Sequence, residues 1–255
     1  MRRLLLLFLI ILLFCIVSCG DSRVEDVFYQ QAEGVSGELE LIERGTGTGL
    51  SEIVEEMKRG VLAQKNRPTV KGIYVTGPVA GSERMNDLIT LVDATELNTM
   101  VIDVKNDDGE ITWKMDTDAV RQMGNGVAYI RDINALMKTL KEHEIYTIAR
   151  IVCFKDPVFA QNHIDCALTK PNGGFVTDAN GLAWVNPYQE KVWDYLTEVA
   201  QAALEVGFDE VQFDYVRFPI GKDADMADYK VDMTDYTKEQ AISGFLSYAC
   251  EQLHE

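Results

Sequence analysis

The sequence predicts an α/β protein built on a parallel sheet. Short apolar runs rich in Val, Ile and Phe alternate with longer segments whose apolar residues recur at helical spacing. Strand and helix candidates follow one another strictly, as parallel strands require because each needs a crossover connection. With 47% apolar and 9% aromatic residues, the chain can also bury a core, which excludes wholesale disorder.

The first two strands and two helices are expected between residues 70 and 142. Residues 70–75 are a strand candidate that ends at Thr76-Gly77-Pro78, and residues 82–97 carry a helical apolar stripe. Residues 99–105, Thr-Met-Val-Ile-Asp-Val-Lys, predict a second, buried strand. After a long acidic loop, a helix is expected at about 130–142.

The second half repeats the alternation. We expect a strand at 146–154, a helix at 186–206, a strand at 209–218 and a last helix from Thr237 to the C-terminus. Asn186 at N-cap, Pro187 at N1 and Gln189 at N3 form a helix-start signal. Thr237 with Gln240 predicts a capping box.

Two architectures fit this order of elements, a doubly wound open sheet and a (β/α) barrel. No GxGxxG motif follows the first strand. The long loops follow strands 2, 3 and 4, at their carboxyl ends, where both architectures place their functional site.

The N-terminus predicts export. Met1-Arg2-Arg3 precedes fourteen apolar residues, 4–17, a run shorter than the ~20 residues of a membrane span. The segment Ile16-Val17-Ser18-Cys19 resembles the lipobox of bacterial lipoproteins, in which the cysteine is acylated. We therefore expect a lipoprotein signal peptide at 1–18 and an extracytoplasmic protein anchored to the cell membrane through Cys19. An ordinary signal and a secreted protein are the alternative.

Residues 19–68 predict an acidic, glycine-rich linker. Gly45-Thr46-Gly47-Thr48-Gly49 breaks any periodicity, and no GK[ST] follows that would make it a phosphate loop. A tether between the membrane and a domain at 69–255 is the expected organisation.

Charge and composition exclude several classes of partner. With 41 acidic and 24 basic residues the net charge is −17, which disfavours nucleic acid as a partner. The three histidines, His143, His163 and His254, are too scattered for a catalytic zinc site, and no metal or other cofactor is expected. Cys153 and Cys166 are compatible with a disulfide or with two free thiols.

Three charged residues interrupt the apolar strands. Asp103 lies in the second strand, Arg150 in the third and Asp214 in the fourth. An ionised side chain in a buried strand is costly unless it is paired, so these residues should face one another at the carboxyl ends. The cluster predicts a functional cleft; the alternative is an ion-pair network that only fixes strand register.

The residue types favour carbohydrate chemistry. Asp214 could attack an anomeric carbon or stabilise an oxocarbenium ion, Arg150 would stabilise its negative charge, and Asp103 could bind sugar hydroxyls. Tyr74 could stack on a sugar ring or pack in the core. Strand alternation puts Arg217 on the opposite side from Asp214, and Arg217 is a further substrate-binding candidate.

Four segments resemble one protein family. They are residues 208–219, the preceding Trp184-Val185-Asn186-Pro187, residues 71–76 and residues 101–105. Over about 69–255 the chain resembles the bacterial family "Putative glycosyl hydrolase domain", also called domain of unknown function 4015. The resemblance implies a TIM-type (β/α) barrel related to α-amylase-like glycoside hydrolases, many of which carry an aspartate nucleophile after strand 4. By that analogy Asp214 is the nucleophile.

The chain carries only the first four βα units of such a barrel, whereas a full barrel takes about 250 residues. Glycosidases need two carboxyl groups, and the second one stays open among Asp103, Asp107 and Asp156. Either the chain is truncated or two half-barrels associate. We expect a glycoside hydrolase acting on extracellular or cell-wall polysaccharide; a non-catalytic carbohydrate-binding lipoprotein or an inactive truncated barrel is the alternative.

Overall fold

The computed structural model describes residues 68–254. The expected signal peptide, the acylated Cys19 and the linker up to residue 67 lie outside the described residues. The compact unit begins at Pro68. None of the helices in this described part is long and apolar enough to span a membrane.

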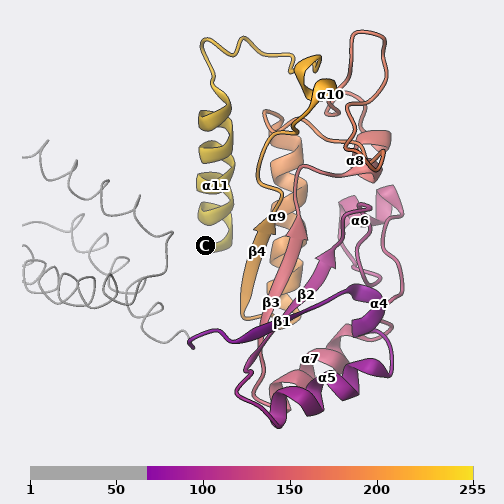
Figure 1. Cartoon of the computed structure of the whole chain (residues 1–255), viewed down its shortest axis with the longest axis vertical. Coiled ribbons are helices and arrows are strands. Elements are labelled where there is room, and N and C mark those ends of the chain that lie inside the picture. The colour runs from indigo at the N-terminus through magenta and orange to yellow at the C-terminus, as the bar shows by residue number, and fades with distance from the viewer. Residues whose placement is uncertain (1–67, 255) are drawn as a thin grey trace, which may run out of the picture. The chain divides into compact units, whose positions relative to one another are not determined.

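A four-stranded parallel sheet forms the centre of the domain (Figure 1). Its strands are β1 (Gly72–Val75), β2 (Thr99–Lys105), β3 (Tyr146–Val152) and β4 (Glu210–Asp214), which lie side by side in chain order. Consecutive strands of a (β/α) barrel have this order. In a doubly wound sheet the strands are also parallel, but later strands are added on the other side of the first one. The prediction of a parallel α/β domain is confirmed.

Eight helices are described between residues 68 and 254. They are α4 (Gly77–Ala80), α5 (Arg84–Asp93), α6 (Asp118–Met123), α7 (Ile133–Glu142), α8 (Pro157–Asn162), α9 (Glu190–Glu205), α10 (Lys222–Asp225) and α11 (Lys238–His254). In Figure 1 the short helices α6, α8 and α10 gather towards the end at which the strand arrowheads point. The loops at the carboxyl ends are therefore partly helical, which periodicity did not predict.

One face of the sheet is buried and apolar. Met100, Ile102 and Val104 of β2 are 0% exposed, as are Ala149 and Ile151 of β3. These residues occupy every second position along each strand, as the two-residue period of a strand requires.

The last helix fixes β4 against this apolar face. The ring of Phe245 in α11 lies 5.3 Å from that of Phe213 in β4, 5.2 Å from Phe154 and 6.2 Å from Trp193 of α9. Figure 1 shows α11 standing beside β4. Because Phe213 faces α11, its neighbour Asp214 faces the other side of the sheet.

Strand β4 is shorter than expected. The prediction extended it to Phe218, but it ends at Asp214 because Tyr215 adopts a left-handed backbone with φ of +54°. Strand alternation therefore stops at Tyr215. The expected alternation therefore does not extend to Arg217, which lines the same pocket as Asp214.

One of the two predicted helix starts is confirmed. The Thr237 amide donates to Gln240 Oε1 at 2.8 Å and the Gln240 amide to Thr237 Oγ1 at 3.3 Å, which is a capping box. Asn186 is not the N-cap of α9, whose N-cap is Gln189. Instead Asn186 is buried, donates to the carbonyl of Tyr229 at 2.7 Å and begins a turn before the helix.

The sequence left open whether two cysteines form a disulfide, and in the structure they are separate thiols. Cys153 and Cys166 are both buried and neither forms a disulfide. Burial raises the pKa of the Cys166 thiol to about 11. Both therefore behave as small apolar side chains in the core.

Candidate active site

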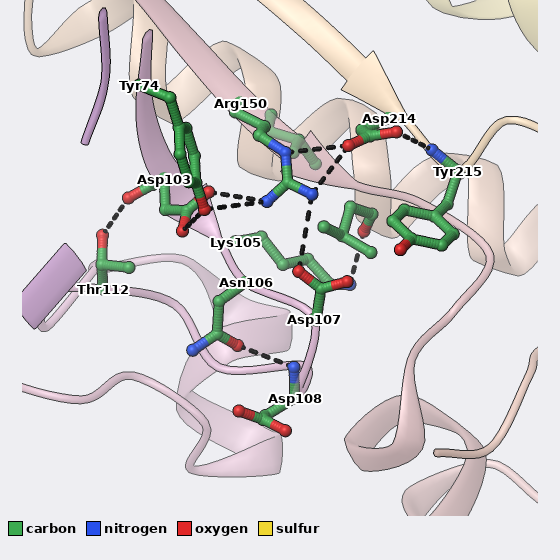
Figure 2. Close-up of polar contacts among 12 residues, drawn as sticks. Tyr74, Asp103, Lys105, Asn106, Asp107, Asp108, Thr112, Arg150, Asp214 and Tyr215 are labelled. Carbon is green, nitrogen blue, oxygen red and sulfur yellow. Dashed lines mark hydrogen bonds and ion pairs between the residues drawn. The ribbon is translucent and has the colours of Figure 1, made fainter. Parts of the chain in front are cut away.

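Arg150 of β3 is the centre of a charged cluster at the carboxyl ends of the strands (Figure 2). Its Nη1 lies 2.7 Å from Asp103 Oδ1, and its Nη2 lies 2.7 Å from Asp214 Oδ2 and 3.4 Å from Asp107 Oδ2. Nε also donates to Asp214 Oδ2 at 2.8 Å. The structure thus brings together Asp103, Arg150 and Asp214, as the cost of leaving buried charges unpaired required.

The register of the strands explains why these three side chains lie together. Asp103 in β2 is the register partner of Arg150, and Gln212, two residues before Asp214, is the partner of Arg150 on the other side. Register partners in a parallel sheet share a face, and so do residues two apart along a strand. The three side chains therefore converge because their positions in the strands are matched.

Asp103 is held by Tyr74 of β1 as well as by Arg150. The Tyr74 hydroxyl donates to Asp103 Oδ2 at 2.6 Å, and Thr112 Oγ1 donates to the Asp103 carbonyl at 2.7 Å. Burial raises the pKa of Asp103, although the hydrogen bonds from Tyr74 and Arg150 act against that shift. With its side chain 4% exposed, Asp103 offers little surface to a ligand.

Tyr74 is not a core residue, which was one of its two expected roles. It is 53% exposed, and its ring centroid lies 5.4 Å from Arg150 Cζ. Partial burial, with the hydrogen bond to Asp103 next in size, raises the pKa of its hydroxyl. Tyr74 therefore links the open edge of the sheet to the buried part of the cluster.

Asp214 is oriented by two partners and remains open. Its Oδ2 receives both Arg150 bonds, and its Oδ1 accepts the Tyr215 amide at 2.6 Å. The side chain is 41% exposed, against 36% for Asp107 and 4% for Asp103. An adjoining open pocket of about 480 Å³ is lined by Arg150, Phe213, Asp214, Tyr215, Val216 and Arg217.

A second group of charges adjoins Arg150, and sequence reasoning missed its central lysine. Lys155 pairs with Asp107, lies 3.9 Å from Asp178 Oδ2, and its Nζ is 3.9 Å from the ring centroid of Tyr215. Its side chain is only 6% exposed. A lysine three residues after the end of the apolar strand β3 is the sequence signal that could have found it.

These contacts set the charge of Asp107. Burial alone would raise its pKa, but the hydrogen bond and charge of Lys155, with Arg150 next, outweigh burial and lower it. The pKa of Lys155 is raised, because its bond to Asp107 outweighs the opposite effect of burial. Asp107 is therefore an anion near neutral pH and holds no proton to donate.

Asp156, another candidate for the second carboxyl group, belongs to the interior. Its Oδ2 lies 2.8 Å from Lys105 Nζ, and their side chains are 2% and 0% exposed. Its Oδ1 accepts the Phe159 amide at 2.8 Å and so caps α8. Asp156 holds the loop after β3 in place and does not reach the pocket.

No metal site accompanies the cluster in the described part of the chain. Across residues 68–254, no three His, Cys, Asp or Glu side chains are grouped so that they could hold a metal ion. The cations facing the carboxylates are those of Arg150 and Lys155.

Parallel βα units with an exposed, arginine-held aspartate at the end of β4 define a glycoside hydrolase-like domain on part of a (β/α) barrel. The chain belongs to the family "Putative glycosyl hydrolase domain", which matches residues 72–255. The resemblance seen in the sequence is confirmed. Among proteins with curated descriptions, none matches the chain.

Solved structures agree with this fold. A hypothetical protein from Ruminiclostridium thermocellum ATCC 27405 is 38% identical with a TM-score of 0.66, and the match covers 71% of this chain and 92% of that one. A GH31 α-xylosidase from a soil metagenome, complexed with xylose, has a TM-score of 0.51 at 12% identity. The galactosidase domain of the α-galactosidase-sucrose kinase AgaSK has a TM-score of 0.50 at 13% identity.

The two glycosidases show the fold alone. The matches cover 72% of this chain in both cases, but only 27% of the xylosidase chain and 26% of the galactosidase chain. The four βα units thus correspond to part of a larger glycosidase fold, and the predicted partial barrel is confirmed.

Proposed function

We propose that this domain hydrolyses glycosidic bonds in extracellular or cell-wall polysaccharide, with Asp214 as nucleophile or oxocarbenium stabiliser. The observation that carries the proposal is the state of Asp214: of the three carboxylates that contact Arg150 it is the most exposed, and it borders the pocket. Such an aspartate at the end of a barrel strand can reach an anomeric carbon.

The surrounding charges suit that chemistry. Asp103, Asp107 and Asp214 face two cations, Arg150 and Lys155, so the cluster keeps a net negative charge. A fixed negative charge stabilises the positive charge that develops on the sugar ring in the transition state. Because Arg150 and the Tyr215 amide already hold Asp214, little reorganisation is needed when the sugar binds.

A second candidate function, carbohydrate binding without catalysis, is favoured by the state of the other carboxyl groups. Asp107 Oδ2 and Asp214 Oδ2 contact the same nitrogen of Arg150, so they are at most about 6.1 Å apart, a bound that includes the roughly 5–5.5 Å spacing of retaining glycosidases. However, Asp107 has a lowered pKa, and Asp103, whose pKa is raised, is buried. Neither is suited to be the general acid.

Self-association would complete the barrel. Within residues 68–254 no strand pairs with the outer edge of β1 or of β4, and a closed barrel leaves no free edge. Two copies could pair β4 of each with β1 of the other and bring two Asp214 clusters to one mouth. Sedimentation equilibrium of the full chain should then give twice the chain mass, and a single-chain mass at all concentrations would exclude the half-barrel dimer.

The proposed location is the outer side of the cell membrane, through an acylated Cys19. Replacing Cys19 with serine should move the protein from the membrane fraction into the medium and abolish labelling by a palmitate analogue. Release without acylation in the unaltered protein would support the secreted alternative.

Turnover tests the role of Asp214. Full-length protein should release reducing ends from a panel of polysaccharides, and Asp214→Asn should lower the rate roughly 10²- to 10⁴-fold. Asp108→Asn is the matched control, because Asp108 is an exposed acid in the loop after β2 and does not line the pocket. Equal rates for Asp214→Asn and the parent protein would refute the assignment; binding without turnover in the parent would favour the second function.

A further inference from the structure

Arg217 lines the same pocket as Asp214 but differs from Arg150 in its partners. Arg150 contacts three carboxylates, whereas no carboxylate between residues 68 and 254 lies within 4 Å of the Arg217 guanidinium. Arg217 is also exposed. An arginine beside the proposed nucleophile that has no acidic partner among the described residues calls for a chemical explanation.

Aromatic rings hold this guanidinium in place. Its Cζ lies 4.9 Å from the ring centroid of Trp184 and 5.3 Å from that of Tyr215. Trp184 is 1% exposed, so it forms a fixed support. The contacts are cation–π interactions, which attract the charge without using its hydrogen-bond donors.

The donors of Arg217 are mostly available. A guanidinium has five N–H groups in one plane, and the described contact is from Nη1 to the carbonyl of Phe218 at 3.1 Å. Contacts to ring faces leave the edge of the guanidinium free to make two parallel bonds to a carboxylate. A planar carboxylate is the anion that matches this fork.

We propose that Arg217 binds the carboxylate of a uronic acid residue, so that the substrate class of this domain is acidic polysaccharide. The inference rests on the proposed function, because it assigns the substrate of the pocket beside Asp214. The volume of about 480 Å³ falls in the range of pockets for small ligands, enough for a sugar unit carrying a carboxylate.

The net charge of −17 does not oppose this assignment at close range. At physiological ionic strength the Debye length is about 8 Å, so distant surface carboxylates are largely screened. The charged residues that line the pocket are Arg150, Asp214 and Arg217. Arg150 is already paired with carboxylates, so Arg217, which forms no ion pair with Asp214, is the cation left to bind a sugar carboxylate.

Binding by the full chain tests the inference. Calorimetric titrations would use oligosaccharides of galacturonic, glucuronic and mannuronic acid, each beside its carboxyl-reduced form, which has the same linkage and no charge. We expect at least one acid to bind roughly tenfold or more tightly than its reduced form. Arg217→Ala should abolish that preference and Arg217→Lys should retain part of it, so that each variant loses more affinity for the acid than for its reduced form.

Arg131→Ala is the matched control, because Arg131 is exposed and does not line the pocket. Equal affinity for acid and reduced forms would overturn the inference, as would an equal loss for both forms in Arg217→Ala. Sulfated oligosaccharides that bind as tightly as the acids would overturn the carboxylate assignment.

Turnover separates this inference from the proposed function. Neutral glycans cleaved in an Asp214-dependent way, without a preference for acids, would overturn the inference alone. Failure to bind or cleave any glycan would overturn both.

Discussion

The two faces of the sheet are made by the same strands and are stabilised in opposite ways. On the helix-covered face, Met100 and Ile102 are 0% exposed and are stabilised by apolar burial. On the other face, Asp103 and Arg150 form an ion pair. The pair stabilises the fold only while each buried charge keeps its partners. Alternation along a strand thus lets one segment build a core and a polar site at once.

The largest expected effect is the loss of the central cation. Arg150→Met should lower the free energy of unfolding by about 3–5 kcal/mol, because Asp103 would remain buried without its ion-pair partner. Urea unfolding at pH 7 measures this. Arg121→Met is the control: Arg121 pairs with Asp116 and Asp118 at the surface, where water screens the ion pairs and the loss should be much smaller. Equal losses in the two variants would show that the buried network contributes no more than surface pairs do.

A packing change on the helix-covered face ranks next. Ile102→Ala should cost about 2–5 kcal/mol through lost burial and a cavity, whereas Val101→Ala, one residue away on the other face, should cost about 1 kcal/mol or less. Thermal unfolding of both variants measures the contrast. Similar losses would contradict the division of the sheet into a packed and a polar face.

The smallest effect concerns Asp107 and depends on pH. Its folded pKa is lowered, so its contribution to stability is present above its unfolded pKa of about 3.9 and is lost as pH falls through the lowered folded value. Asp107 is about one-third exposed, so Asp107→Asn should cost about 1 kcal/mol or less at pH 7. Urea unfolding at pH 7 and pH 3 should show a smaller difference from the parent at pH 3; a difference that grows at pH 3 would reverse the sign.

The sequence predicts the sheet and the centre of the site well, for physical reasons. Strand β2 lies at the expected 99–105, because a continuous apolar run leaves few other structures. The convergence of Asp103, Arg150 and Asp214 followed from the cost of burying unpaired charge. Lys155 escaped prediction because its role depends on Asp107 and Tyr215, which meet it only through the fold.

The end of β4 was not predicted correctly, for a different reason. Tyr215-Val216-Arg217-Phe218 has the β-branched and aromatic composition of a strand, and non-glycine residues seldom adopt the left-handed backbone that Tyr215 has. Because strand alternation ends at Tyr215, it does not place Arg217, which lines the pocket beside Asp214. The family and the partial barrel are established, while the roles of the individual site residues stay predictions.

The left-handed backbone at Tyr215 separates two kinds of evolutionary constraint. Before it, any insertion or deletion would shift β4 against β3 and move Asp214 away from Arg150. After it, the chain is a loop no longer bound by strand register, so its length and composition can vary without disturbing the sheet. A change of sequence beyond residue 215 can therefore alter what the domain recognises while the aspartate–arginine centre stays in place.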